Sequence, residues 1–188
     1  MISTTDFRNG LKLAVDGDPM EIIDYQHVKP GKGGAFVRTK MRNLKTGNVL
    51  ERTFRSGEKF EEPEVEEKHM QYLYLQEGNY HFMDVKSYEQ LFLTKTQMGD
   101  AWQFVKENME VDIVFWKGKP LGVSPPVFVE LKIVDTAPGI RGDTATGGTK
   151  PATLESGAVV KVPFHIEQGS VIKVDTRTKA YVERVKGP

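Results

Sequence analysis

The chain has 188 residues, of which 38% are hydrophobic and 28% charged, a composition typical of a folded globular protein rather than a disordered one. It contains no cysteine, which excludes disulfides and thiolate metal sites. No apolar run approaches the roughly 18 residues of a membrane-spanning helix, and the first eight residues lack an apolar signal core. We therefore expect a soluble cytoplasmic protein that does not associate with membranes.

The formal net charge is zero, but the charges are unevenly distributed along the chain. Residues 1–60 carry 11 Lys/Arg and 7 Asp/Glu, whereas residues 61–126 carry 6 and 12. Between residues 29 and 55, eight basic side chains accompany a single acid, Glu51. A local basic field indicates a polyanionic partner such as nucleic acid, with a chance basic face as the alternative. The acidic middle segment argues against contact with nucleic acid along the whole chain.

Short strand-like segments separated by turn residues fill the first part of the chain. They are residues 11–15, 20–28, 36–41 and 49–54. Gly, Asn and Asp between them mark turns, and this spacing predicts a small β-barrel. The polar segment 55–63 ends in a proline, so we place the first domain at residues 1–63.

The rest of the chain continues the strand pattern. Strands are expected at residues 71–75, 80–85, 110–117, 127–134, 158–162, 171–174 and 181–185, with a hairpin turn at Gly78-Asn79. Residues 100–107 are the helix candidate, with Asp100 as its N-cap. The fold class is therefore all-β, with a central domain at 64–127 and a C-terminal domain at 128–188, the last an oligonucleotide-binding (OB) type barrel.

A lysine stands at the tip of a glycine-rich turn between two of the expected strands. The turn reads Lys29, Pro30, Gly31, Lys32, Gly33 and Gly34. Proline fixes one φ angle, and the glycines leave no side chains beside Lys32. Such a lysine can enter a narrow space or be reached by a modifying enzyme. The alternative is an ordinary hairpin tip with a solvated lysine.

The sequence shows no pattern of catalytic or metal-binding residues. The histidines are His27, His69, His81 and His165, and their spacing does not match a metal site. The loop 142–150 resembles a phosphate-binding loop, but Gly148 stands where that motif needs lysine. We therefore expect neither an enzyme nor a bound metal.

Two further features are compatible with RNA binding. Residues 135–150 form a long polar loop whose amides, hydroxyls and Arg141 suit phosphate and ribose contacts. Several aromatic residues could form a base-stacking platform, although most are expected in the core. They are Tyr72, Tyr74, Tyr80, Phe82, Trp102, Phe104, Phe115 and Trp116.

Several separate segments resemble the bacterial elongation factor P family, and together they span the whole chain. They are Lys29-Pro30-Gly31-Lys32-Gly33, Phe7 to Leu11, Phe128 to Leu131 with Val134-Asp135-Thr136, and Lys150 to Leu154 continuing to Gly169. A paralogous family departs from the pattern at Lys32 and at Gly142-Asp143-Thr144, both of which are kept here. The archaeal and eukaryotic relative has two domains, whereas this chain has a third segment.

The resemblance implies a KOW/SH3-like barrel followed by two OB barrels in an L-shaped arrangement. It implies a monomeric translation factor, without cofactor or enzymatic activity, that binds both ribosomal subunits between the peptidyl and exit sites. The Lys32 loop would reach the CCA end of a peptidyl- or initiator tRNA, and the loop with Arg141, Gly142, Asp143 and Thr144 would lie near the small-subunit exit-site codon. The factor would relieve stalling at consecutive prolines.

The resemblance also implies that a lysine-modifying enzyme extends Lys32 with a β-lysyl or 5-aminopentanol group. The candidate phosphate contacts beside that loop are Arg38, Lys40, Arg42 and Lys45. Two alternatives stay open on the residues alone. One is a single-strand RNA-binding module that uses residues 64–188, and the other is an enzyme acting on RNA.

Overall fold

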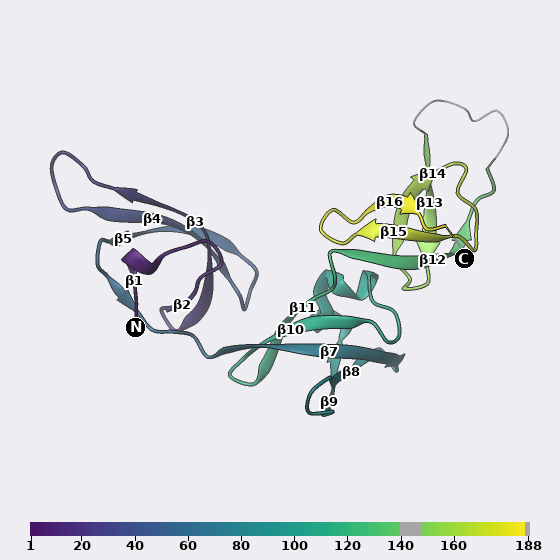
Figure 1. Cartoon of the computed structure of the whole chain (residues 1–188), viewed down its shortest axis with the longest axis horizontal. Helices are drawn as coiled ribbons and strands as arrows, with labels where there is room; N and C mark the ends of the chain where they lie inside the picture. The colour runs from purple at the N-terminus through teal and green to yellow at the C-terminus, as the bar shows by residue number, and fades with distance from the viewer. Residues whose placement is uncertain (140–147, 187–188) are drawn as a thin grey trace. The chain divides into compact units, whose positions relative to one another are not determined.

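The computed structural model describes residues 1–139 and 148–186, and strands dominate the described residues (Figure 1). The chain divides into two compact units, residues 1–67 with 114–122 and residues 68–113 with 123–188. The all-β fold class is confirmed. Within the described residues, no helix is long and apolar enough to cross a membrane.

The N-terminal sheet is an antiparallel meander. Its order is β2 (Lys12–Val15), β3 (Asp18–Val28), β4 (Phe36–Asn43) and β5 (Val49–Arg55). A separate two-stranded sheet pairs β1 (Ile2–Ser3) with β6 (Lys59–Phe60), and the 3₁₀ turn η1 (Thr4–Asp6) follows β1. The buried side chains gather around Phe7, Leu13, Ile22, Val37 and Met41. This core fixes the inner face of β3 and β4, the two strands that carry the lysine loop.

Two-residue turns close three of the hairpins. Their residues are Asp16-Gly17, Glu77-Gly78 and Lys117-Gly118, and both residues of each pair have positive φ. Positive φ at both positions is the backbone of a type I′ turn, whose twist matches that of the paired strands. The central hairpin turn was predicted at Gly78-Asn79 and lies one residue earlier, because Gln76 pairs with Asn79.

The central sheet has five strands in the order β11-β10-β7-β8-β9. Their bounds are β7 (Val65–Gln76), β8 (Asn79–Asp84), β9 (Gln90–Thr94), β10 (Glu110–Trp116) and β11 (Lys119–Ser124). The sequence did not indicate β9 and β11, which are short and follow polar turns. Strand β9 lies at one edge of the sheet.

The predicted helix at 100–107 is wrong. The only α-helix among the described residues is α1 (Lys95–Met98). Thr94 is its N-cap, and a capping box between Thr94 and Gln97 stabilises its first turn. Gly99, with φ at 56°, ends α1. The 3₁₀ turn η2 (Gly99–Gln103) follows, and Asp100 pairs with Lys179 Nζ at 2.9 Å instead of capping a helix.

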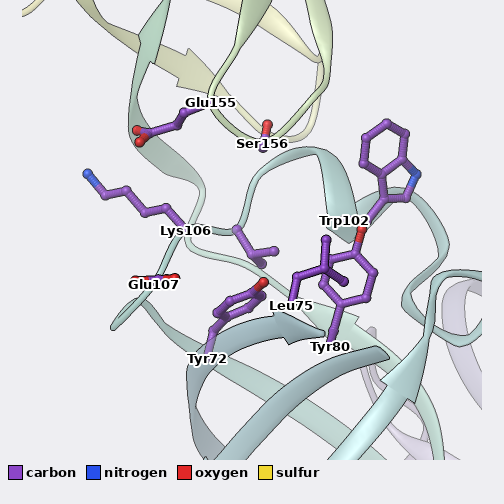
Figure 2. A pocket seen from close by; sticks show the side chains of 9 residues that line it. Tyr72, Leu75, Tyr80, Trp102, Lys106, Glu107, Glu155 and Ser156 are labelled. Carbon is purple, nitrogen blue, oxygen red and sulfur yellow. The ribbon is translucent and has the colours of Figure 1, made fainter. Parts of the chain in front are cut away.

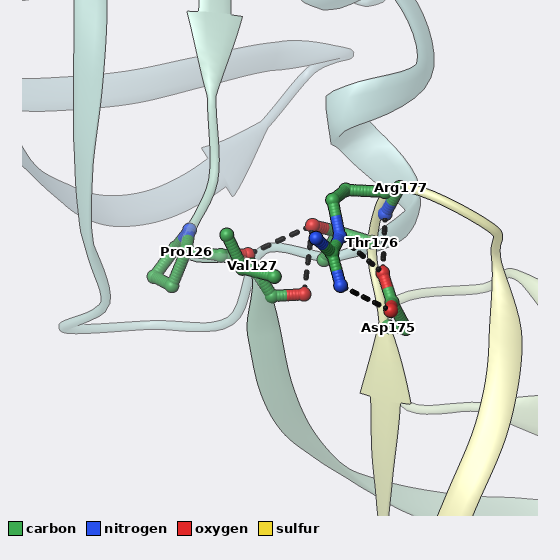
Figure 3. A network of polar contacts seen from close by, with 5 residues as sticks. All are labelled: Pro126, Val127, Asp175, Thr176 and Arg177. Atoms are coloured by element: carbon green, nitrogen blue, oxygen red, sulfur yellow. Dashed lines mark hydrogen bonds and ion pairs between the residues drawn. The ribbon is translucent and has the colours of Figure 1, made fainter.

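The C-terminal sheet has the order β14-β13-β12-β15-β16. Its strands are β12 (Phe128–Thr136), β13 (Thr149–Leu154), β14 (Val159–Pro163), β15 (Val171–Asp175) and β16 (Ala180–Arg184). Thr176 in the β15–β16 turn donates its hydroxyl hydrogen to the carbonyls of Pro126 at 2.8 Å and Val127 at 3.1 Å (Figure 3). Asp175 accepts two hydrogen bonds from the Arg177 guanidinium, which lowers the pKa of this carboxyl. The Thr176 bonds hold the β15–β16 turn against the segment that leads into β12, while the Asp175–Arg177 pair is internal to the turn.

A histidine links β7 to β10. His69 lies between two carboxylates, with Nδ1 2.8 Å from Asp112 Oδ1 and Nε2 2.8 Å from Glu110 Oε2. Both hydrogen bonds, the one to Asp112 first, raise the pKa of His69. The three side chains are about half exposed, so solvent weakens the interaction.

We expect this contact to make stability depend on pH. A raised pKa means that the folded form holds the proton more tightly, so the contribution is complete below the unfolded value of about 6.5. It is lost as pH rises through the higher folded value. The Tm difference between the wild type and His69→Gln should therefore be larger at about pH 5 than at about pH 9. Equal differences at both pH values would contradict this role.

Candidate functional site

The lysine loop is carried by the β3–β4 hairpin. Val28 pairs with Phe36 at the end of the ladder, so residues 29–35 form the connection (Figure 1). Lys32 is exposed at this tip, as are its neighbours from Lys29 to Gly34. The predicted presentation of Lys32 away from the core is what the structure shows.

The three glycines of the loop differ in whether the backbone conformation requires glycine. Gly33 has φ at 100°, a conformation that disfavours any other residue. Gly31 and Gly34 lie outside this region, and a Cβ added at either would meet no atom within 4 Å. The folded chain itself therefore does not require glycine at 31 and 34. Their effect is to leave the surroundings of Lys32 free of side chains.

A row of cations follows the outer face of β4. Arg38, Lys40 and Arg42 are exposed and alternate with buried Val37, Thr39 and Met41. The strand pairing puts Lys40 between Asp24 and Glu51, and puts Arg42 opposite Glu21. Arg38 lies between two uncharged residues, Gln26 and Thr53. Because neither of these neighbours is acidic, the charge of Arg38 is the least offset in the row. Arg38 is also the cation of this row closest to the lysine loop.

Lys45 differs from the other three predicted phosphate contacts. Its Nζ lies 3.1 Å from Asp18 Oδ1, and Asp18 also accepts a hydrogen bond from Asn43. Lys45 and then Asn43 lower the pKa of the Asp18 carboxyl. The charge of Lys45 is therefore engaged in holding the turn after β4, and the structure does not bring it together with the cations of β4.

The predicted small-subunit loop, Arg141, Gly142, Asp143 and Thr144, lies outside the described residues. The described residues next to it are closely packed. Lys150, which is 5% exposed, donates a hydrogen bond to the carbonyl of Ala137. A Cβ added at Gly148 would lie 2.0 Å from the ring of Phe164, so a larger residue there would require that ring to move.

The predicted aromatic platform separates into core and surface. Tyr72, Tyr80, Phe82, Phe104 and Phe115 are buried, whereas Tyr74 is 40% exposed. Tyr74 stacks on the half-buried His81, which in turn contacts the exposed Phe92, and neither of these two was among the predicted platform residues. The signal for Phe92 was the short apolar run Leu91-Phe92-Leu93, which follows a polar turn.

A cavity of about 390 Å³ is lined by residues of η2, the central sheet and the turn after β13 (Figure 2). The phenol rings of Tyr72 and Tyr80 form its floor, with Trp102, Glu107 and Ser156 around it. Burial, followed by the nearby Tyr80 and Glu107, raises the pKa of Tyr72 to about 12. This phenol therefore stays neutral at physiological pH and cannot serve there as a base. Among residues 1–139 and 148–186, no group of His, Asp or Glu side chains could hold a metal ion.

Three family models match consecutive parts of the chain. They are the elongation factor P KOW-like domain over residues 3–60, the elongation factor P OB domain over 65–123 and the elongation factor P C-terminal domain over 129–184. The chain belongs to the elongation factor P family. Family members are non-enzymatic translation factors, and the expected KOW-like and OB domains are confirmed.

Curated relatives extend this similarity over the full length. Elongation factor P of Thermodesulfovibrio yellowstonii is 56% identical over 186 residues, which cover 99% of this chain and all of the relative. Elongation factor P of Natranaerobius thermophilus is 56% identical over 187 residues and covers both chains completely. The family assignment therefore rests on every part of the sequence.

Solved structures show a related translation factor. The eukaryotic translation initiation factor 5A from Methanococcus jannaschii is similar with a TM-score of 0.52 and 25% identity. The match covers 65% of this chain and 94% of that protein. The match therefore leaves about a third of this chain without a counterpart in that protein.

Proposed function

We propose that this protein binds the ribosome between the peptidyl and exit sites and stimulates peptide bond formation at consecutive prolines. The Lys32 loop would contact the CCA end of the peptidyl- or initiator tRNA, and residues 141–144 would contact the small subunit near the exit-site codon. The observation that carries the proposal is the exposed Lys32, held at the tip of a hairpin with no side chain beside it.

Positioning alone can accelerate this reaction. Proline is a slow partner because its ring restricts backbone geometry and its nitrogen is secondary. A factor that holds peptidyl-tRNA in a reactive arrangement removes part of the entropic barrier without supplying an acid or a base. This suits a member of a non-enzymatic family whose loop presents a lysine at its tip.

Covalent extension of Lys32 fits the same geometry. Because Lys32 and its neighbours are exposed, a lysine-modifying enzyme can reach its amine. A β-lysyl or 5-aminopentanol group would lengthen the reach of the side chain and keep a polar end. Such an enzyme must select Lys32 over Lys29. Lys32 differs from Lys29 in having a glycine on each side.

Bulk beside Lys32 should impair function without impairing folding. We expect Gly31→Val or Gly34→Val to lower the rate of rescue by about tenfold, because misplacement of a positioning group is costly. Thermal melting should be unchanged, since both positions have open space and no positive φ. Gly122→Val is the matched control, because Gly122 also has open space and lies on β11. Full rescue by the loop variants would contradict a narrow binding space around Lys32.

Electrostatic attraction to RNA should depend more on Arg38 than on Lys40. We expect Arg38→Gln to reduce the slope of ribosome affinity against salt by about 1, as loss of one phosphate contact does. Lys40→Gln should reduce it less, because Asp24 and Glu51 already flank that charge. Binding measured over a salt series tests this. Equal slopes for the two variants would show that the flanking acids do not matter.

The proposal as a whole is tested by in vitro translation of a template with three consecutive prolines. Adding the protein purified from its native host should restore full-length product with compatible ribosomes. A template without prolines is the control and should respond little. Failure to restore product, with the protein folded, would leave only the coarser conclusion that this is a translation factor of the family.

A further inference from the structure

Three aromatic side chains form a row across the outer face of the central sheet. Tyr74 on β7, His81 on β8 and Phe92 on β9 are directly opposed in the strand pairing. The rings of Tyr74 and His81 are stacked, with centroids 4.6 Å apart and planes 20° apart. The rings of His81 and Phe92 are 5.8 Å and 42° apart. We call this row the aromatic ladder.

The aromatic ladder does not belong to the core. Tyr74 is 40% exposed and Phe92 is 56% exposed, whereas Tyr72, Tyr80 and Phe82 on the same strands are buried. The inner face of the sheet is therefore already filled by other rings. An exposed group of aromatic side chains marks a binding surface more often than a lone exposed one does.

On β7, β8 and β9 the outer face beside the aromatic ladder carries no carboxylate, lysine or arginine, and the carboxylates of that face, Glu110 and Asp112 on β10, are engaged by His69. By the strand pairing, the residues that share this face are Gln71, Tyr74, Gln76, Asn79, His81, Met83, Gln90, Phe92 and Thr94. The chain as a whole is 28% charged, so an uncharged strip on the acidic middle segment is a clear departure. Four of the nine are amides, which can both donate and accept hydrogen bonds.

The ring geometry leaves a free stacking position at the sheet edge. The 4.6 Å separation of the Tyr74 and His81 rings is close to the spacing of neighbouring strands, about 4.8 Å, so these two rings stand upright side by side. Phe92 ends the row on β9, the edge strand, and no further strand follows. A flat group placed against the outer side of Phe92 would continue the row.

We propose that the aromatic ladder binds an unpaired RNA base, which stacks on Phe92 with Gln90 and Asn79 available to its polar edge. Base stacking on aromatic side chains is tolerant of sequence, and amides suit the donors and acceptors of base edges. An apolar protein contact is less well matched, because Met83 is the single aliphatic side chain on a face with four amides. This inference is separate from the action of Lys32.

The test uses the unmodified full chain and a tetra-adenylate RNA at low salt. The aromatic NMR signals of Tyr74, His81 and Phe92 should shift on titration. Phe92→Leu keeps an apolar side chain but removes the flat ring, and it should weaken binding by about fivefold, the lower end of one base–aromatic stack. Phe92→Trp should bind at least as tightly as the wild type, a result that misfolding cannot produce.

A further variant serves as a control. Tyr88→Leu removes an aromatic ring that is 70% exposed but outside the aromatic ladder, and it should bind RNA like the wild type. The titration follows only the signals of Tyr74, His81 and Phe92, so RNA held at the lysine loop does not affect the readout, which separates this inference from the proposed function. Unmoved ladder signals, or equal loss in Phe92→Leu and Tyr88→Leu, would overturn the inference. Wild-type binding by Phe92→Leu would overturn it as well, in favour of a general apolar contact.

Discussion

Replacement of Lys32 with alanine is expected to abolish rescue of translation at consecutive prolines. The side chain lies at the tip of the β3–β4 connection, with exposed neighbours from Lys29 to Gly34 that could not replace its reach. The loss should appear as full-length product from a template with three prolines falling to the level without added protein. Because an exposed side chain contributes little to folding, stability should change by no more than about 0.5 kcal/mol.

The matched control for this variant is Lys29→Ala. Lys29 is exposed in the same loop and carries the same charge, but it lies next to Pro30 at the edge of the loop rather than between glycines. It should retain most of the rescue activity. Comparable losses in both variants would mean that general positive charge matters rather than the position of Lys32, and full activity of Lys32→Ala would exclude the proposed role.

Local signals in the sequence were sufficient for the hairpin that carries Lys32. Proline and glycine between two alternating segments define a turn wherever they occur, and Val28 pairs with Phe36 as that pattern requires. The helix candidate at 100–107 failed for an equally local reason. The capping box of Thr94 and Gln97 begins the helix earlier, and Gly99 ends it after one turn.

Properties that depend on strand pairing could not be predicted. In the sequence Arg38, Lys40, Arg42 and Lys45 are equivalent cations, but the register opposes acids to Lys40 and Arg42. Lys45 meets Asp18, a residue 27 positions earlier in the chain. The aromatic ladder likewise exists only because the register of β7, β8 and β9 aligns three rings from separate segments.

The largest effect on stability is expected from substitution of Phe104. The sequence did not reveal where this side chain packs. Phe104 follows η2 and is 1% exposed, yet it packs in the core of the C-terminal barrel with residues such as Leu131, Leu154 and Ile172. The Ser156 hydroxyl donates to the carbonyl of Gln103 at 2.6 Å and holds the same segment in place. The C-terminal barrel therefore completes its core with a side chain from the preceding domain.

We expect Phe104→Ala to lower the free energy of unfolding by about 3–5 kcal/mol, because it removes a buried ring and leaves a cavity. The matched control is Phe128→Ala, which removes the same side chain from a position on β12 that is 47% exposed and should cost about 1 kcal/mol or less. Denaturant unfolding followed by circular dichroism measures both. Similar losses in the two variants would mean that the barrel does not depend on Phe104. A loss confined to Phe104→Ala would show that the segment after η2 is an integral part of the C-terminal core.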